Sequence, residues 1–291
     1  MSKKVIVIFG STGMLGHTLT HYFKTKTNYC VIPLTRKHYD VLKGNHNDLV
    51  NLFKIFPRQS VIVNTIGLIP QTGNTNTQDY YTINSEFPKQ LDQLSILYNH
   101  KFIHITTDCV FNGLQNGNYT EDSIKDETND YGKSKALGEE LESATIIRTS
   151  IIGEQLGSTL SYKSLLEWVV SNKNNEINGY TNHYWNGVTC LRLSEIIHIM
   201  IKHNLYWKKV NHIFSNTVSK YDLLNYINDI YNLNIKINPC KCNQQIDKTL
   251  YTNHLTNTII NKYIGEINIQ NQIKTQYSFF KELLSDTNIT N

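Results

Sequence analysis

An α/β fold, built on a doubly wound parallel sheet with a smaller C-terminal lobe, is predicted by three features of this 291-residue sequence. Short apolar runs alternate with amphipathic stretches, a glycine-rich turn follows the first run, and the fourth run ends in reactive side chains. Strands that alternate with helices pair in parallel. We expect strands at 4–9, 29–34, 60–66, 102–107 and 145–149, and helices at 17–22, 48–56, 79–98 and around Tyr131.

The first strand leads into the turn Gly10-Ser-Thr-Gly13-Met-Leu-Gly16, after which an amphipathic helix begins. Glycines at this spacing let the backbone approach a pyrophosphate, and the helix N terminus supplies N–H donors and a favourable dipole. Strand, glycine turn and helix in this order predict a Rossmann-type dinucleotide site. The residues assigned to the cofactor here are Gly10, Ser11, Thr12, Gly13, Met14, Leu15 and Gly16.

The ends of the second and third strands add to the predicted cofactor site. An NAD site usually places Asp or Glu after the second strand, whereas a guanidinium there suits a 2′-phosphate. This chain has Arg36 at that point, so the expected cofactor is NADP(H); a solvated surface charge is the competing interpretation. Asn64, at the end of the third strand, is assigned to the nicotinamide half of the cofactor.

Tyr131 and Lys135 lie four residues apart in a predicted helix, so their side chains share one face. An ammonium beside a phenol favours the phenolate, and such a tyrosine can exchange a proton with a carbonyl or alcohol near neutral pH. The chain contains four Tyr-x-x-x-Lys pairs, so the spacing alone is weak evidence. The Thr106–Cys109 segment at the fourth strand end is the context that selects this pair.

The second half of the chain is less regular. Helices are predicted at 161–171, 192–203, 220–231 and 270–284, and a strand at 210–214. We expect residues 1–155 to form the NADP-binding domain and 156–291 mainly a substrate-binding lobe, with segments near 188–214 returning to the first sheet. The polar loop at 172–187 contains Trp185, which suits a ligand with a flat base; a packed aromatic corner explains it equally well.

Composition excludes several classes of protein. The net charge of +4 is spread along the chain, which argues against nucleic acid or a membrane surface as a partner. No apolar run approaches the roughly 18 residues of a membrane span, and the N terminus leads straight into a strand. Five cysteines without a secretory signal indicate free thiols and a cytoplasmic protein. Cys240 and Cys242 lack a second ligand pair, so no metal site is predicted.

These motifs resemble the extended short-chain dehydrogenase/reductases, and within them the dTDP-4-dehydrorhamnose reductase group. The likeness includes the glycine turn, the Thr107–Gly113 segment, the Tyr131 pair and Arg148-Thr-Ser150. It implies hydride delivery from NADPH to a sugar C4 ketone, with Tyr131 giving the proton, Lys135 holding the nicotinamide ribose and Thr107 binding the oxygen. Substrate contacts are assigned to Asn84, Thr107, Asp108 and Trp185, although Asn84 could equally cap a helix or lie on the surface.

Cys109 is a departure from the simple reductases of this group, which carry Tyr there. The GDP-fucose synthases, which epimerise C3 and C5 before reduction, carry Cys. The chain therefore most resembles bifunctional 3,5-epimerase/4-reductases that convert UDP-4-keto-6-deoxyglucose, supplied by an upstream 4,6-dehydratase, to UDP-L-rhamnose. The C4 ketone makes the protons on C3 and C5 more acidic, and a thiolate is a suitable base to remove them. Lys163 is the expected acid on the opposite face, with His183 in reserve.

Two alternatives stay open. The chain resembles reductases that act on C4 only, and it also resembles the non-catalytic regulatory chain of methionine adenosyltransferase. The intact set of Thr107, Tyr131 and Lys135 favours an enzyme. The nucleotide (UDP, dTDP or GDP) and the formation of a homodimer are left open by the sequence.

Overall fold

The computed structural model describes residues 3–74, 76–155 and 164–288. Its centre is a six-stranded sheet in the order β10-β5-β4-β3-β1-β2, in which all neighbouring strands are parallel. The strands are β1 (Val5–Phe9), β2 (Cys30–Leu34), β3 (Val61–Asn64), β4 (Lys101–Thr107), β5 (Thr145–Thr149) and β10 (Lys209–His212). The predicted doubly wound parallel sheet is confirmed.

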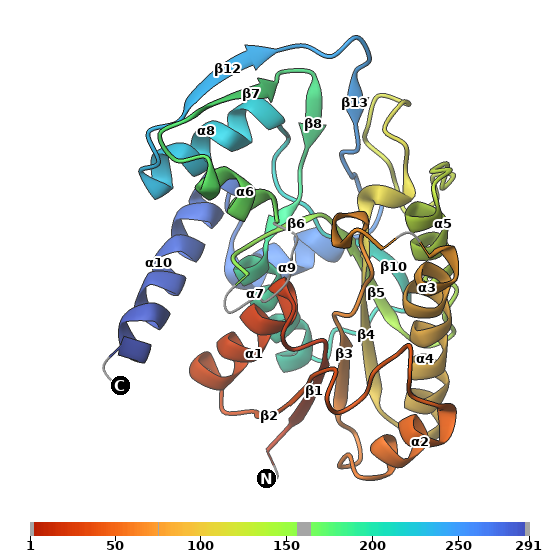
Figure 1. Ribbon diagram of the computed structural model, residues 1–291. Coiled ribbons are helices and arrows are strands. Elements are labelled where there is room, and N and C mark those ends of the chain that lie inside the picture. Colours follow the sequence, from red (N-terminus) through yellow and green to blue (C-terminus); the bar gives the residue numbers. More distant parts are fainter. Residues whose placement is uncertain (1–2, 75, 156–163, 289–291) are drawn as a thin grey trace.

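Helices cover both faces of this sheet (Figure 1). One face carries α1 (Met14–Lys26), α7 (Cys190–Lys202) and α9 (Thr256–Ile264), and the other carries α2 (His46–Lys54) and α4 (Phe87–Leu97). Along β1, Ile6 and Ile8 enter the first of these two cores. Val7 and Phe9 enter the second. Because successive side chains point to opposite faces and both faces are buried, the strand is a continuous apolar run.

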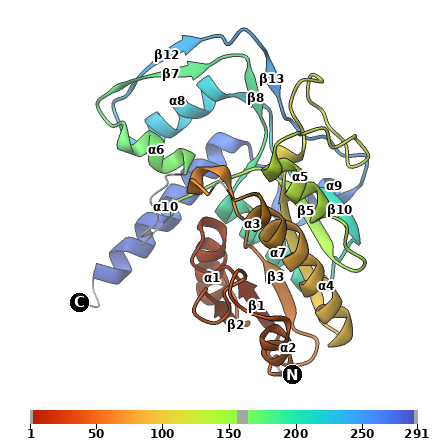
Figure 2. The same cartoon turned by 45° about the vertical axis from the view of Figure 1, so that its right-hand side comes forward.

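The second lobe lies beyond the carboxyl ends of the strands (Figure 2). Its helices are α6 (Leu165–Ser171) and α8 (Lys220–Tyr231), and its strands are β7 (Glu176–Tyr180), β8 (His183–Trp185), β11 (Val218–Ser219), β12 (Lys236–Cys240) and β13 (Ile246–Asp247). Leu166, Val169, Leu223 and Ile227 belong to a core of its own. The last helix, α10 (Ile269–Asn288), packs against both α7 and α8 and so joins the lobe to the sheet layer.

Shorter elements shape the edge of the sheet that faces the lobe. They are η1 (Pro70–Thr72), α3 (Thr77–Tyr81), the π-helical turn η2 (Thr82–Glu86), η3 (Asp108–Val110), α5 (Asp130–Leu137), β6 (Ile151–Ile152) and β9 (Val188–Thr189). The helix predicted at 79–98 is therefore divided into α3, η2 and α4. Pro88 explains the division, because it lacks the N–H that would bond to the carbonyl of Asn84 in a regular α-helix.

Other boundaries also differ from the predictions. The stretch 172–187, expected to be a loop, contains β7 and β8, since Ile177 and Trp185 are buried in the lobe core. The helix expected from residue 161 begins at Leu165, where Ser164 caps it by accepting a hydrogen bond from the Glu167 amide; residues 161–163 lie outside the described part. Helix α9 was not predicted.

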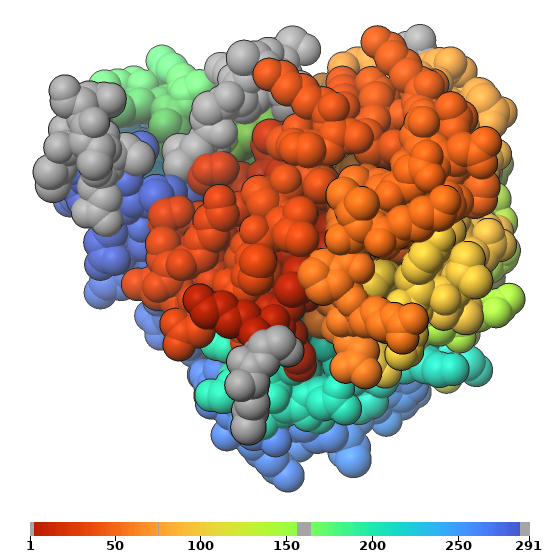
Figure 3. Space-filling model, turned by 90° about the horizontal axis from the view of Figure 1, so that it is seen from below, coloured from red at the N-terminus to blue at the C-terminus, as the bar shows by residue number. Residues whose placement is uncertain are grey.

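The chain returns to the sheet after entering the lobe. β10 pairs with β5, Lys209 opposite Thr145, and so extends the sheet at one edge. From below, the teal segment around residue 200 lies next to red and orange segments of the first half (Figure 3). Within the described residues, no helix is both long and apolar enough to cross a membrane.

Candidate active site

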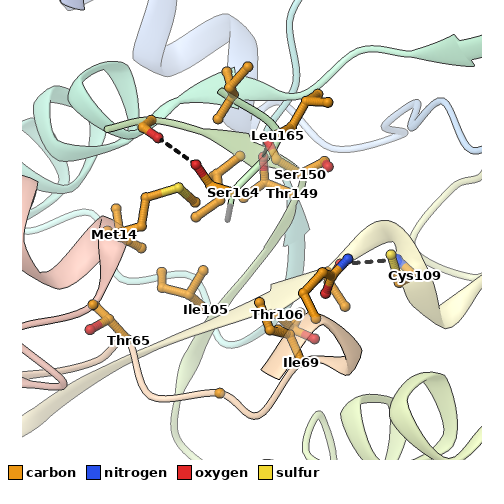
Figure 4. Close-up of a pocket in the computed structure, with 18 of the residues that line it drawn as sticks. Met14, Thr65, Ile69, Ile105, Thr106, Cys109, Thr149, Ser150, Ser164 and Leu165 are labelled. Atoms are coloured by element: carbon orange, nitrogen blue, oxygen red, sulfur yellow. Dashed lines mark hydrogen bonds between the residues drawn. The ribbon is translucent and has the colours of Figure 1, made fainter. Parts of the chain in front are cut away.

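A cavity of about 560 Å³ lies where the carboxyl ends of the sheet strands meet the second lobe. Its walls come from the glycine turn, the ends of β3, β4 and β5, helix α5 and the lobe. Figure 4 shows Met14 and Thr65 near one end of this space and Cys109 at the other, with Ser164 bonded to the Gly153 carbonyl above. Open α/β sheets bind ligands at this edge.

The glycine turn has the geometry that a pyrophosphate requires. Gly10 has a φ of +82°, which favours glycine, and a Cβ atom on Gly16 would overlap the Gly10 carbonyl. Gly13 caps α1 without a side-chain hydrogen bond, and the first turn of α1 contains no acidic residue. The helix therefore keeps its amide donors and positive dipole end available to an anion.

The predicted cofactor residues divide into two groups. Gly13, Met14 and Leu15 line the cavity, whereas Gly10, Ser11, Thr12 and Gly16 form the turn around it. The Leu34 carbonyl accepts hydrogen bonds from the Gly10 and Ser11 amides, at 3.1 and 3.0 Å. This contact fixes the end of β2 against the turn and places the exposed Arg36 two residues beyond it.

Asn64 does not line the cavity. Its side chain is fully buried, lies 3.2 Å from His104 Nδ1 and accepts a hydrogen bond from the Ile66 amide at 3.1 Å. The neighbouring residues Thr65, Ile66 and Gly67 line the cavity instead. Asn64 thus shapes the loop that faces the predicted nicotinamide position, and its side chain is fully used in doing so.

Helix α5 places Tyr131 and Lys135 on the same wall of the cavity. Asn129 caps the helix by accepting a hydrogen bond from the Gly132 amide at 2.8 Å. Lys135 Nζ donates to the Ile105 carbonyl at 3.1 Å, which anchors the ammonium beneath the end of β4. Burial lowers the pKa of Lys135 to about 8, although the charge of Glu139 opposes this shift.

Tyr131 is held as a neutral phenol. Burial raises the pKa of Tyr131 well above its usual value, and the charge of Cys109 adds to the rise, while a hydrogen bond with Thr107 opposes it. The lowered Tyr131 pKa expected beside Lys135 does not result, because desolvation raises this pKa. A protonated phenol is the form that can give a proton to a substrate oxygen.

Thr107, the last residue of β4, caps the turn η3, which contains Asp108 and Cys109. Thr107 Oγ1 accepts a hydrogen bond from the Cys109 amide and donates one to Asp108 Oδ1, both at 3.1 Å. Thr107 and Cys109 line the cavity, whereas the buried Asp108 carboxylate lies behind them. Burial and the neighbouring Asp108 raise the pKa of the Cys109 thiol to about 12. The charge of Lys248 and a hydrogen bond with Thr107 oppose this rise without cancelling it, so the surroundings of the thiol disfavour the thiolate that the sequence suggested.

The remaining predicted substrate residues have different positions. Trp185 lines the cavity from the lobe. Asn84 is fully buried in η2 and does not line it: its amide nitrogen donates to the Leu68 carbonyl and to Ser134 Oγ, both at 3.0 Å. His183 lies in β8 with its ring stacked on Tyr180, outside the lining. Lys163 falls outside the described residues.

Comparison with known proteins identifies the family. Residues 3–249 match the family model described as the RmlD substrate binding domain. The chain belongs to this RmlD family. A dTDP-4-dehydrorhamnose reductase of Aggregatibacter actinomycetemcomitans is 28% identical over 151 residues, 50% of each chain. The spore coat polysaccharide biosynthesis protein SpsK of Bacillus subtilis is 31% identical over 159 residues, 53% of this chain and 55% of the relative. The chain thus spans about half the length of these curated relatives.

Solved structures show the same fold as this RmlD-family chain. A dTDP-4-dehydrorhamnose reductase of Clostridium acetobutylicum has a TM-score of 0.77 at 20% identity, covering 95% of this chain and 99% of its own. The Bacillus anthracis reductase in complex with NADP has a TM-score of 0.77 at 18% identity, with the same coverage. A GDP-L-fucose synthetase of Naegleria fowleri has a TM-score of 0.76 at 14% identity, covering 97% and 95%.

Among the cavity residues of the RmlD-family chain that sequence reasoning missed are two large side chains of the second lobe. Trp168 on α6 lines the cavity with 40% of its surface exposed, and Lys220 on α8 lines it from the same lobe. Lys220 had a detectable signal, because a lysine at the first position of a helix lies at the positive end of the dipole. Among the described residues, no cluster of three or more His, Cys, Asp or Glu could hold a metal ion.

Proposed function

We propose that this chain is an NADP(H)-dependent reductase of the C4 ketone in a nucleotide-linked 4-keto-6-deoxyhexose. The observation that carries the proposal is that Thr107, Tyr131 and Lys135 line the same cavity as the glycine turn. The proton donor and the glycine turn that suits the cofactor thus line one cavity. The family match and the printed names of the relatives support the sugar-nucleotide substrate.

The residues around the glycine turn fit a dinucleotide. The uncapped N terminus of α1 and the close approach of Gly16 to Gly10 suit the pyrophosphate. Arg36, held near the turn by the β2 contact, suits a 2′-phosphate, and NADP is the nucleotide bound in a structural neighbour. When bound, NADPH supplies a hydride to the carbonyl carbon.

Residues of the chain protonate the carbonyl oxygen and stabilise the charge that develops during reduction. Tyr131, protonated because it is buried, donates its phenol proton to the oxygen as negative charge develops there. Thr107 orients the phenol, and its own hydroxyl is fixed by Asp108 and the Cys109 amide. Lys135, anchored on the Ile105 carbonyl, brings a positive charge to the same wall and favours the anion that Tyr131 becomes.

A second activity, epimerisation at C3 and C5, has one observation in its favour: Cys109 lines the cavity beside Thr107 and Tyr131. A thiol with a pKa of about 12 opposes it, since only about one thiol in 10⁵ is ionised at pH 7. We therefore rank reduction alone above the epimerase/reductase suggested by the sequence. Deuterium incorporation from D₂O into the keto sugar, measured by NMR without NADPH, distinguishes the two functions.

The test of the proposal is oxidation of NADPH by the purified chain. We offer dTDP-4-dehydrorhamnose, UDP-4-keto-6-deoxyglucose and dTDP-4-keto-6-deoxyglucose, and identify the products by NMR. Reduction at C4 of one of these ketones is the expected result. A chain that binds NADPH but reduces none of them would contradict the proposal and favour a non-catalytic member of the same fold.

A further inference from the structure

Lys220 is a cation in the cavity that the reduction chemistry does not use. It is the first residue of α8, whose cap Ser219 accepts a hydrogen bond from the Asp222 amide at 3.1 Å. Lys220 Nζ lies 5.4 Å from the centre of the Trp185 ring, and both side chains line the cavity. Within the described part of the chain, this ammonium has no ion-pair or hydrogen-bond partner, so its three donors are free.

The position of Lys220 is energetically unfavourable for a lysine. Burial lowers the pKa of Lys220, and the positive end of the α8 dipole disfavours a cation in the first turn. The charges of Asp108 and Cys109 favour the ammonium, but neither residue pairs with it. Lys220 is half-buried, and a partly desolvated ammonium without a partner gains most from an oxygen atom that a ligand supplies.

Lys220 lines the same cavity as Cys109 and Tyr131. Lys220 interacts with Cys109, and Cys109 in turn interacts with Tyr131. Within the described residues Asp108 forms no ion pair with Lys220, and its Oδ1 accepts hydrogen bonds from Thr107 Oγ1 at 3.1 Å and Cys109 Sγ at 3.6 Å. Lys220 thus lines the space into which the proton donor Tyr131 also opens.

Resting on the proposed function, we propose that Lys220 is a substrate-binding residue whose ammonium donates a hydrogen bond to the C3 hydroxyl of the sugar. In a 4-keto-6-deoxyhexose, the ketone has two carbon neighbours. C5 carries a methyl group and the ring oxygen, whereas C3 carries a hydroxyl. With the carbonyl oxygen at Tyr131, the C3 hydroxyl is the one free hydroxyl next to the reacting carbon, and Lys220 holds it against the Trp185 side of the cavity.

The test measures binding without turnover. We titrate the wild type and Lys220→Met with dTDP-rhamnose or UDP-rhamnose, according to the nucleotide that the wild type turns over, and with the 3-deoxy analogue of the same compound. A charged hydrogen bond predicts that the wild type binds the 3-deoxy analogue about 10- to 100-fold more weakly. Lys220→Met should bind the parent compound more weakly by a similar factor and should not distinguish the two ligands. KM for the ketone should rise while kcat changes only a few-fold.

A matched control separates contact from long-range charge. Lys248 also acts on Asp108 and Cys109 through its charge, but it pairs with Glu127 at 3.3 Å and does not line the cavity. Lys248→Met should keep the preference for the 3-hydroxyl. Lys220→Gln serves as a second variant if the methionine variant does not fold.

Three results would overturn the assignment: Lys220→Met that still prefers the parent compound, an equal loss of preference in Lys248→Met, or a defect confined to kcat. These outcomes are distinct from failure of the proposed function. A wild type that reduces no 4-keto sugar contradicts the function itself, whereas turnover with unchanged ligand preference in Lys220→Met contradicts only the role of Lys220.

Discussion

Asn84 Nδ2 lies 3.0 Å from Ser134 Oγ, and this hydrogen bond ties the π-helical turn η2 to the helix that carries Tyr131 and Lys135. The same side-chain amide forms two hydrogen bonds with the backbone of Leu68. Its Nδ2 donates to the Leu68 carbonyl at 3.0 Å, and its Oδ1 accepts from the Leu68 amide at 2.9 Å. One buried side chain therefore holds the loop after β3 against α5. Its role is to position the two walls of the cavity.

We expect Asn84→Ala to destabilise the protein by about 1–3 kcal/mol, because it leaves the Leu68 backbone groups and the Ser134 hydroxyl without their partner. Urea unfolding at pH 7 measures the change. Asn51→Ala is the control, since Asn51 is exposed on α2 and its side chain accepts a hydrogen bond from the exposed Lys54; its effect should stay within about 0.5 kcal/mol. Equal effects in the two variants would show that the hydrogen bonds of Asn84 are unimportant for stability.

Arg36→Ala should weaken NADPH binding about 10- to 100-fold and leave NADH binding unchanged, because only NADPH carries the 2′-phosphate that a guanidinium can bond. Fluorescence titration with both nucleotides measures the preference. Lys37→Ala alters the adjacent exposed cation and should have a smaller effect. Equal affinity of the wild type for NADPH and NADH would refute the assignment.

Tyr131→Phe should lower kcat for ketone reduction by about 10²- to 10⁴-fold, the usual effect of removing a general acid. NADPH binding should persist. Tyr80→Phe is a suitable control, because its ring lies 6.4 Å from that of Tyr131 while its hydroxyl bonds to the Asn74 carbonyl outside the cavity. Near-normal turnover by folded Tyr131→Phe would mean that another group supplies the proton.

Cys109 should react slowly with iodoacetamide at pH 8, because a pKa of about 12 leaves almost no thiolate. Cys30 and Cys242 are exposed and should be labelled first. Peptide mass spectrometry over a time course gives the order. In parallel, Cys109→Ser should retain ketone reduction within a few-fold. Preferential labelling of Cys109 would indicate an ionised thiol and revive the epimerase interpretation.

His212 should make stability depend on pH below neutrality. Its Nδ1 lies 2.6 Å from the Tyr251 carbonyl and its Nε2 lies 2.8 Å from Arg148 Nη1, an arrangement that suits the neutral ring. Burial and Arg148 lower the pKa of His212 from 6.5 to about 4, although Glu121 and Glu139 oppose the shift. Because the unfolded chain binds the proton more readily, this contribution is complete above pH 6.5 and is lost as the pH falls toward 4.

The pH-dependent contribution of His212 to the free energy of unfolding is up to about 3 kcal/mol. We compare the unfolding free energies of the wild type and His212→Gln at pH 7 and pH 4.5. The advantage of the wild type should shrink at the lower pH. His46→Gln, which changes an exposed histidine on α2, should leave the pH dependence unchanged. A constant difference between the wild type and His212→Gln would exclude this role.

Local sequence patterns were sufficient to predict the fold class and several residues that line the cavity. The alternation of apolar runs and amphipathic helices specifies a parallel sheet, because each pattern reflects which faces of a single element are buried. The Gly10–Gly16 turn and the four-residue spacing of Tyr131 and Lys135 are also local, since a few neighbouring backbone angles fix their geometry. These features lie where they were predicted.

Contacts between segments that are distant in the sequence determined the features of the cavity that the sequence did not predict. Lys220 and Cys109 are far apart in sequence, and only the packing of the lobe over the sheet brings them to one cavity. Asn84 links two segments that are distant in the sequence, because its buried side chain bonds to Leu68 and Ser134. The pKa values of Tyr131 and Cys109 are raised, not lowered as the sequence suggested, because they depend on the burial that the whole fold creates, which no local pattern records.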